Sequence, residues 1–201
     1  MSFTYRHTTA ASYIGYIVQA AVNNLPPLLF VIFRNQFGIS MEAITLLISI
    51  NFIIQMIVDV LATKFLGRIG CKRAAVAAHF FGCAGLAGMG ILPFILPPYA
   101  GLCISVILSA IGGGLIEVVV SPIVDSLPGE KKAASMSLLH SFYCWGSVGV
   151  ILLSTAFLAV FGMERWPILA CIWAVLPLYN TFNFLSCPIE SVSYTHLRAH
   201  E

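Results

Sequence analysis

Two ionisable side chains, Glu117 and His140, lie deep inside stretches of sequence that are otherwise apolar. At about 1.5 Å per helical residue, Glu117 lies about 12 Å and His140 about 10 Å from the polar turn between these stretches. Ionisable groups are costly in hydrocarbon, so their presence indicates a functional site, and both can bind and release protons. They lie level on consecutive helices and could be neighbours, although the sequence does not establish that they face each other.

Amide side chains form a second group of candidates. Asn23 and Asn24 are followed by two prolines at 26–27 within an apolar run. Proline interrupts the helical hydrogen-bond ladder, and a membrane helix tolerates this only where neighbours or a cavity satisfy the freed backbone groups. We therefore expect both asparagines to face a polar cavity at mid-depth. A kinked helix that serves only for packing is the alternative.

A polar stripe occurs in the next apolar run. Asn51, Gln55 and Asp59 are spaced four residues apart, so they share one helical face. Such a face must lie against protein or water. It could line a pore or form hydrogen bonds to a neighbouring helix, and the spacing favours neither.

The composition indicates an integral membrane protein. Of the 201 residues, 59% are hydrophobic and only 9% are charged, whereas a soluble domain is about one-quarter charged. The mean hydropathy is +0.95. The net charge of +2 is too small to indicate a nucleic-acid partner. The six cysteines are scattered and form no metal-binding pattern, so we expect no metal. The sequence has no H-E-x-x-H motif, nucleophile elbow or paired-acid site, so we expect no enzyme activity and no cofactor.

Six apolar segments are long enough to cross a bilayer as helices. We expect an all-α membrane protein with one domain at 1–190 and helices at about 10–33, 41–62, 74–96, 99–124, 133–161 and 166–185. Lys and Arg are concentrated in alternate connections, seven on one side and two on the other, which predicts a multi-pass protein of the cytoplasmic membrane with a cytoplasmic N-terminus. Residues 191–201 are abruptly polar and look like a non-native tail.

The third segment contains residues that we expect to serve packing. Gly82, Gly85 and Gly88 recur at three-residue spacing and form a small-residue face for close helix contact. His79, about 9 Å from the end of the same helix, is more simply explained as a hydrogen-bonded structural histidine than as a proton carrier.

Six spans with a basic loop at 64–73 resemble one half of a major facilitator superfamily transporter. The loop pattern of that family, Gly-x-x-x-Asp-Arg-x-Gly-Arg-Lys, is matched at Arg68, Gly70 and Lys72, while Gly67 replaces the aspartate and Cys71 an arginine. The stretch GGGLIEVVVSPIVDSLPGEKKAASMSLLHSFYCWGSVG is similar to the fourth and fifth helices of fucose-permease-like sugar:proton symporters. The resemblance implies the N-terminal half of a twelve-helix carrier, with a missing C-terminal half as its partner.

The same resemblance implies roles for individual residues. Glu117 would take part in substrate binding and proton coupling, and His140 would line the cavity. The acid that these symporters can carry in the first helix is replaced here by the prolines after Asn24. Candidates for holding a sugar are the amides Asn23 and Asn24 together with Asn51, Gln55, Phe142 and Tyr143. Candidates for conformational gating are Asp59, Arg68, Gly70, Lys72, Arg73 and Asp125.

The sequence therefore predicts a secondary active transporter that moves a small polar solute, a sugar by resemblance, by alternating access and with protons as a second partner. Two alternatives stay open. The chain could belong to a drug or metabolite exporter of the same fold, in which Glu117 would attract cationic substrates. It could also be an inactive truncated half-carrier or an assembly module, because one half leaves a face open. Proton-coupled uptake of sugars would distinguish the symporter from the exporter.

Overall fold

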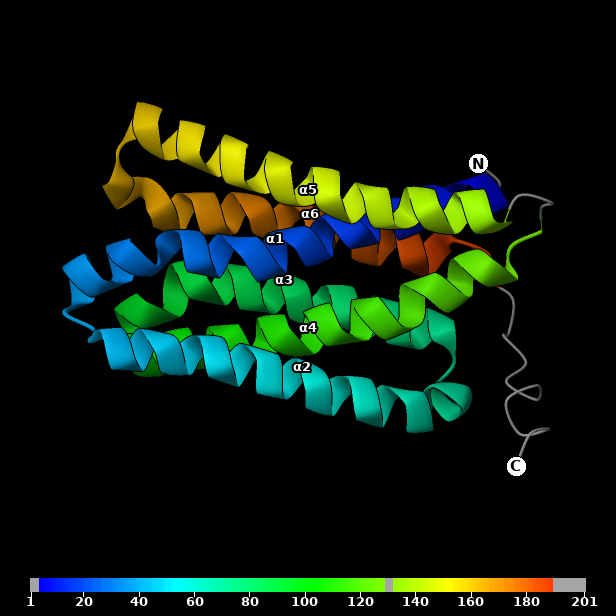
Figure 1. Ribbon diagram of the computed structural model, residues 1–201, viewed down its shortest axis with the longest axis horizontal. Coiled ribbons are helices and arrows are strands. Elements are labelled where there is room, and N and C mark those ends of the chain that lie inside the picture. The colour runs from blue at the N-terminus through cyan, green and yellow to red at the C-terminus, as the bar shows by residue number, and fades with distance from the viewer. Residues whose placement is uncertain (1–3, 129–131, 190–201) are drawn as a thin grey trace.

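The structure, a computed structural model, describes residues 4–128 and 132–189. Six long helices run alongside one another (Figure 1), and each is long and apolar enough to cross a membrane. Their bounds are α1 Tyr5–Phe37, α2 Met41–Ile69, α3 Cys71–Ile95, α4 Pro98–Ser126, α5 Lys132–Phe161 and α6 Trp166–Ser186, with a short 3-10 helix η1 at Met163–Arg165. The predicted all-α membrane class is confirmed.

Local signals in the sequence explain where several helices begin and end. Ser40 caps α2, because its Oγ accepts a hydrogen bond from the Ala43 amide at 3.3 Å. Gly38 ends α1 in the left-handed conformation, with φ of +65°. Pro98 opens α4, where a missing N–H has no cost in the first turn. These short connections keep consecutive helices antiparallel.

The basic segment at 64–73, predicted as a loop, is almost entirely helical. α2 continues to Ile69 and α3 begins at Cys71, so Gly70 alone joins them, with φ of +84°. The expected ends at 62 and 74 were wrong because a membrane helix does not have to stop where its charged residues begin. Its backbone bonds are internal, and the apolar side chain of Leu66 remains buried at 4% exposure.

The first helix also extends past its predicted bounds of 10–33. It begins at Tyr5 and continues through Pro26 and Pro27 to Phe37. The polar residues at its two ends lie in helix because they can face water or headgroups while the backbone hydrogen bonds stay within the helix. The bounds of α4, α5 and α6 agree closely with the predicted segments.

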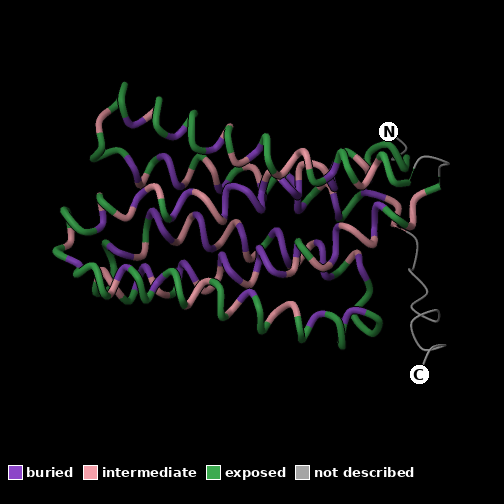
Figure 2. The backbone as a smooth tube through the Cα atoms, viewed as in Figure 1, coloured by how far each residue is buried: buried purple, intermediate pink, exposed green. Residues whose placement is uncertain are grey.

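The core is formed mainly by α1, α3 and α4. In the most apolar window of each helix, 61% of residues are buried in α1, 50% in α3 and 56% in α4, but only 17% in α2 and 22% in α5. Figure 2 shows the same contrast, with buried positions concentrated on the inner helices and exposed positions along α2 and α5. The outer helices therefore offer broad apolar faces to surroundings outside this chain.

Small residues bring α3 and α4 into backbone contact. A Cβ added at Gly112 of α4 would lie 2.5 Å from the Gly82 amide nitrogen of α3, and one added at Gly85 would overlap the backbone of Ser109. The predicted small-residue face of α3 is confirmed at these two glycines. This seam fixes α4, and with it the depth and direction of Glu117.

Candidate functional site

The helix α1 lies between Glu117 of α4 and His140 of α5. From α1, Gln19 donates a hydrogen bond from Nε2 to Glu117 Oε2 at 3.1 Å. Three residues earlier, the Tyr16 ring meets the His140 ring edge-on at 5.4 Å between centroids, while its hydroxyl lies 2.8 Å from Ser121 Oγ. Glu117 and His140 thus contact two different side chains, Gln19 and Tyr16, on one face of α1, and no hydrogen bond joins them directly in the described part of the chain.

The surroundings of Glu117 are rich in hydrogen-bond acceptors. Its side chain is exposed, whereas Gln19 is 4% exposed and its Oε1 has no hydrogen-bond partner among the described residues. Among the described residues, Gln19 is the only one whose side chain donates a hydrogen bond to Glu117. Such a group can attract a proton, a cation or a solute with several hydroxyl donors.

The polar stripe of α2 faces α1 and α4, so it lies against protein, one of the two surroundings that we expect for it. Gln55 donates from Nε2 to Asn23 Oδ1 at 2.9 Å. Asn51 and Asn23 line a small cavity of about 40 Å³ beside the two prolines of α1. Gln55 thus bonds to a neighbouring helix, as one alternative expects, whereas Asn51 borders a small cavity, and a pore-lining role for the stripe stays a prediction.

The glycines before Glu117 make room for this stripe. A Cβ at Gly113 would lie 3.6 Å from both Asn23 Oδ1 and Gln55 Nε2, and one at Gly114 would lie 3.2 Å from Asp59 Oδ1. The Gly113 distances are ordinary contacts, but at Gly114 a larger residue would force the α2 side chains beside it to shift. Gly112 packs against the backbone of α3 instead, so the triplet is explained by close helix packing on two sides of α4.

The adjacent amides of α1 point to different helices. Asn23 bonds to α2, but Asn24 donates to the Ala20 carbonyl at 2.8 Å and to Ser147 Oγ of α5 at 3.2 Å. Neighbours on a helix lie about 100° apart in projection, so the two amides meet different helices, and the expectation that both face one polar cavity stays a prediction. Asn23 alone borders the small cavity.

The aromatic candidates on α5 pack against other aromatic or core residues. Phe142 stacks on Tyr13 of α1 with centroids 4.7 Å apart and planes 10° apart. Tyr143 is half-buried against the core, whereas Trp145 is 64% exposed. The stack fixes α5 on α1, and the exposed indole leaves a surface on which a sugar ring could stack.

The gating candidates divide into two places. Asp59 lies well inside α2 beside Gly114, away from the α2–α3 joint at Gly70. At the joint, Lys72 donates from Nζ to the Cys187 carbonyl at 3.1 Å and so ties the start of α3 to the end of α6. The remaining candidates, Arg68, Arg73 and Asp125, are exposed at the same end of the bundle. Residues 129–131 and the predicted tail at 191–201 lie outside the described residues.

His79 forms a separate, fully buried polar cluster. Its Nδ1 lies 2.7 Å from the Ala75 carbonyl, and its Nε2 lies 2.9 Å from Asn180 Nδ2 of α6. The Asn180 amide also donates to the Ala11 carbonyl at 2.9 Å. Each ring nitrogen has a partner when the histidine is neutral, which confirms the prediction of a structural role.

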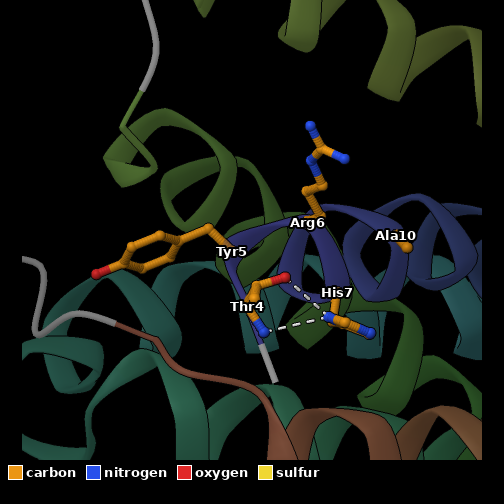
Figure 3. A pocket seen from close by; sticks show the side chains of 5 residues that line it. All are labelled: Thr4, Tyr5, Arg6, His7 and Ala10. Carbon is orange, nitrogen blue, oxygen red and sulfur yellow. Dashed lines mark hydrogen bonds between the residues drawn. The ribbon is translucent and has the colours of Figure 1, made fainter. Parts of the chain in front are cut away.

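A recess of about 770 Å³ lies at the start of α1, lined by Thr4, Tyr5, Arg6, His7 and Ala10. Figure 3 shows the Thr4 nitrogen and hydroxyl both turned toward His7 Nδ1, at 3.1 and 3.0 Å, while the Arg6 side chain points away from them. This arrangement caps the helix. It is more than one helical turn removed from Tyr16 and does not contribute to the Glu117 site.

Sequence reasoning did not select Gln19, Tyr16 or Ser121 as site residues. The signal for Gln19 was an amide in an apolar run, four residues before Asn23 and thus on the same face. Ser121 likewise follows Glu117 by four residues. Tyr16 carries no comparable signal, because a tyrosine in an apolar helix is compatible with ordinary packing.

Comparison with known proteins places the chain in a family. Residues 12–188 match the model of the Major Facilitator Superfamily, whereas no curated protein matches the chain. Among solved structures, it is similar to a mutant of the peptide transporter POT in complex with sulfate, with a TM-score of 0.74 and 17% sequence identity. That match covers 89% of this chain and 37% of the transporter, and at this identity it shows the fold alone. Because the family match spans most of the sequence, the chain belongs to the Major Facilitator Superfamily.

Proposed function

We propose that this chain is the N-terminal six-helix half of a secondary active transporter that moves a small polar solute, a sugar, together with protons. The observation that carries the proposal is the exposed carboxylate of Glu117, held by buried Gln19 within helices that are otherwise apolar. An ionisable group is costly among apolar helices, so its presence indicates that it binds a solute or a proton. The resemblance of the α4–α5 sequence to fucose-permease-like symporters supports the sugar.

The chemistry of the site suits coupling. A carboxyl group in a low-dielectric cavity changes between its charged and neutral forms when its surroundings change, as they do in alternating access. Glu117 would bind a proton and hydrogen-bond a sugar hydroxyl from the same position. Asn23, Asn51 and Gln55 would bind further hydroxyls, and Trp145 would provide an apolar surface. His140, in contact with Tyr16, would line the cavity.

The proposed carrier works in the cytoplasmic membrane with its N-terminus in the cytoplasm, because Lys and Arg are concentrated at that end of the bundle. α2 and α5 are the least buried helices and have broad apolar faces for lipid and for a second six-helix half. The solute would bind between the two halves near mid-depth. The Gly70 joint and the Lys72 contact with Cys187 would move as the halves rock.

The test is uptake by vesicles that contain the full-length carrier encoded by the reading frame of this chain. A panel of labelled sugars is supplied with and without an inward proton gradient. The proposal predicts that at least one sugar is accumulated only with the gradient. Accumulation that ignores the gradient, or no uptake of any sugar, would contradict it.

Two substitutions assign the residue roles. Glu117→Gln should abolish gradient-driven uptake while membrane insertion is retained, and pH-dependent uptake that persists unchanged in this variant counts against Glu117. His140→Ala should shift the pH profile of uptake if His140 acts with Glu117. An unmoved profile would make His140 a packing residue.

A second candidate function is export of a cationic or amphipathic compound. It is favoured by the excess of acceptors at the site, where Glu117 has an amide but no cationic side chain as its hydrogen-bond partner in the described ranges. Efflux of a cationic dye that depends on Glu117, together with no sugar uptake, would select this function. If neither substrate class moves, the chain is an inactive half-carrier.

A further inference from the structure

We infer that a groove between α3 and α6, with Lys72 and Arg73 at its mouth, binds an anionic phospholipid of the surrounding bilayer. The two cations would hold the phosphate of the lipid, and one acyl chain would lie along the apolar wall of the groove. The inference does not rest on the proposed function, because lipid binding can be measured on this chain without transport.

The groove lies at the end of the bundle where α3 begins and α6 ends (Figure 1). Its volume is about 490 Å³, which is within the usual size of ligand pockets. Its lining includes Val76 and Phe80 from α3 and Thr181 and Leu185 from α6. Both helices are long and apolar enough to cross a membrane, so the apolar part of the groove is open to lipid.

The mouth of the groove is positively charged. Lys72 donates one hydrogen bond from Nζ to the Cys187 carbonyl at 3.1 Å, and its ammonium group has two further donors. Arg73 is exposed and forms no ion pair with any described residue. The described residues that line the groove include no acid. Two positive charges are therefore available to a phosphate, which guanidinium and ammonium groups both bind.

The wall behind the mouth is apolar. Phe80 follows Lys72 by eight residues and lies about 12 Å further along α3 at 1.5 Å per residue. Its ring is 61% exposed although it lies inside the span, and it meets the Phe81 ring edge-on at 6.0 Å between centroids. Leu185 of α6 is 52% exposed. An acyl chain that extends from a phosphate at the mouth would cover these side chains and gain from their burial.

The groove offers charge at one end only. Thr181, a polar residue of the lining, donates its hydroxyl to the Pro177 carbonyl at 2.8 Å and is thereby satisfied. A second recess, of about 610 Å³ between α5 and α6, contains Phe157 and Trp173 and no charged residue in its described lining. That recess has nothing to select a headgroup. The groove at Lys72 and Arg73 combines a cationic mouth with an apolar wall, as a phospholipid requires.

The charge of the mouth also favours one class of phospholipid. Basic pockets between membrane helices bind anionic headgroups, and each Lys or Arg near an anionic membrane surface contributes about 1 kcal/mol. A zwitterionic headgroup brings a cation of its own, which Lys72 and Arg73 repel. We therefore expect phosphatidylglycerol to bind more tightly than phosphatidylcholine with the same acyl chains.

The experiment is native mass spectrometry of the detergent-solubilised chain, titrated with each of these two lipids. The groove variant combines Lys72→Gln with Arg73→Gln. The control combines Lys64→Gln with Arg68→Gln, which removes the same charge from exposed residues of α2 outside the groove. The wild type and the control should bind phosphatidylglycerol about tenfold or more tightly than phosphatidylcholine, and the groove variant should lose this preference.

A second pair of variants tests the acyl chain. Phe80→Ala should weaken the binding of both lipids severalfold, because it removes the exposed ring from the wall. Phe161→Ala removes a ring that is 60% exposed near the other end of the bundle and should leave lipid binding unchanged. Equal binding by Phe80→Ala and the wild type would contradict a tail in the groove.

An undiminished preference in the groove variant, or an equal loss in the control, would overturn the inference. Should the groove variant fail to fold, Arg73→Gln decides against Lys64→Gln, since the exposed Arg73 side chain has no described partner to lose. Its preference for phosphatidylglycerol must then be the weaker of the two. Displacement of the lipid by an equal concentration of glycerol phosphate would indicate a site for a free anion and would refute the lipid assignment.

Discussion

Replacing Gly112 by alanine should loosen the seam that holds α4 against α3. The added methyl group would lie 2.5 Å from the Gly82 amide nitrogen and 2.8 Å from the Ala78 carbonyl oxygen. Both are backbone atoms of α3 that cannot rotate aside. Since comfortable contacts lie at about 3.5–4.0 Å, the helices must separate by about 1 Å.

The expected loss of stability follows from this overlap. Overpacking of this kind costs about 1–3 kcal/mol, while the better helix propensity of alanine returns about 0.5–1 kcal/mol. A net loss of about 1–2 kcal/mol lowers the Tm by about 2–8 °C for a chain of this size. The assay is thermal unfolding in detergent with a thiol-reactive fluorogenic dye. The exposed Cys144 reacts at once and sets the baseline, and the rise above it on heating reports the buried Cys71 and Cys187.

Gly149 of α5 provides a matched control. It lies in a helix interior like Gly112, but nothing lies within 4 Å of its Cβ position. Gly149→Ala should leave the Tm unchanged or raise it slightly. Equal Tm values for Gly112→Ala and the wild type, or equal losses in both glycine variants, would refute the packing argument.

Three further substitutions test single hydrogen bonds. Asn180→Ala leaves His79 Nε2 buried without its partner, so stability should fall by about 1–3 kcal/mol in the same dye assay. Trp166→Phe removes the Nε1 donor to Gln36 Oε1 at 2.7 Å and should cost about 0.5–1.5 kcal/mol. Gln19→Leu removes the donor to Glu117, a charged hydrogen bond of about 1.5–3 kcal/mol, and gradient-driven uptake should fall about tenfold or more.

The two stability variants each have a control substitution, and the uptake variant has a result that would contradict it. Asn183→Ala removes only a 3.3 Å bond to Asn180 and should be milder than Asn180→Ala. Trp145→Phe changes an indole that is 64% exposed, so a loss equal to that of Trp166→Phe would contradict the assignment. Uptake by Gln19→Leu at the wild-type rate, with equal protein in the membrane, would show that Gln19 does not support Glu117.

The sequence was sufficient for the parts of the fold that depend on hydropathy and local geometry. Six apolar runs gave six helices, and Gly82 and Gly85 lie at the predicted close contact. These features depend on residues near one another in the chain. The ends of α1 and α2 were misjudged because charge marks the edge of the hydrocarbon and not the end of a helix.

The site was predictable only in part. The depth of Glu117 could be read from spacing, but its partner could not, since the rotation of α1 against α4 is set by packing along the whole interface. Asn24 was expected to share a cavity with Asn23, and its bond to α5 could not be read from the sequence. Asp59 was grouped with the basic segment because the sequence does not show that Gly114 opens a place for it on α4.

The most direct test of the proposed coupling is the steady-state accumulation of a transported sugar at an imposed inward gradient of one pH unit. One proton per neutral solute can drive up to about tenfold accumulation, because one pH unit is about 1.4 kcal/mol. The account predicts accumulation in this range for the wild type and none for Glu117→Gln, with exchange of sugar for sugar retained in the variant. Equal accumulation by both proteins would contradict the central role of Glu117.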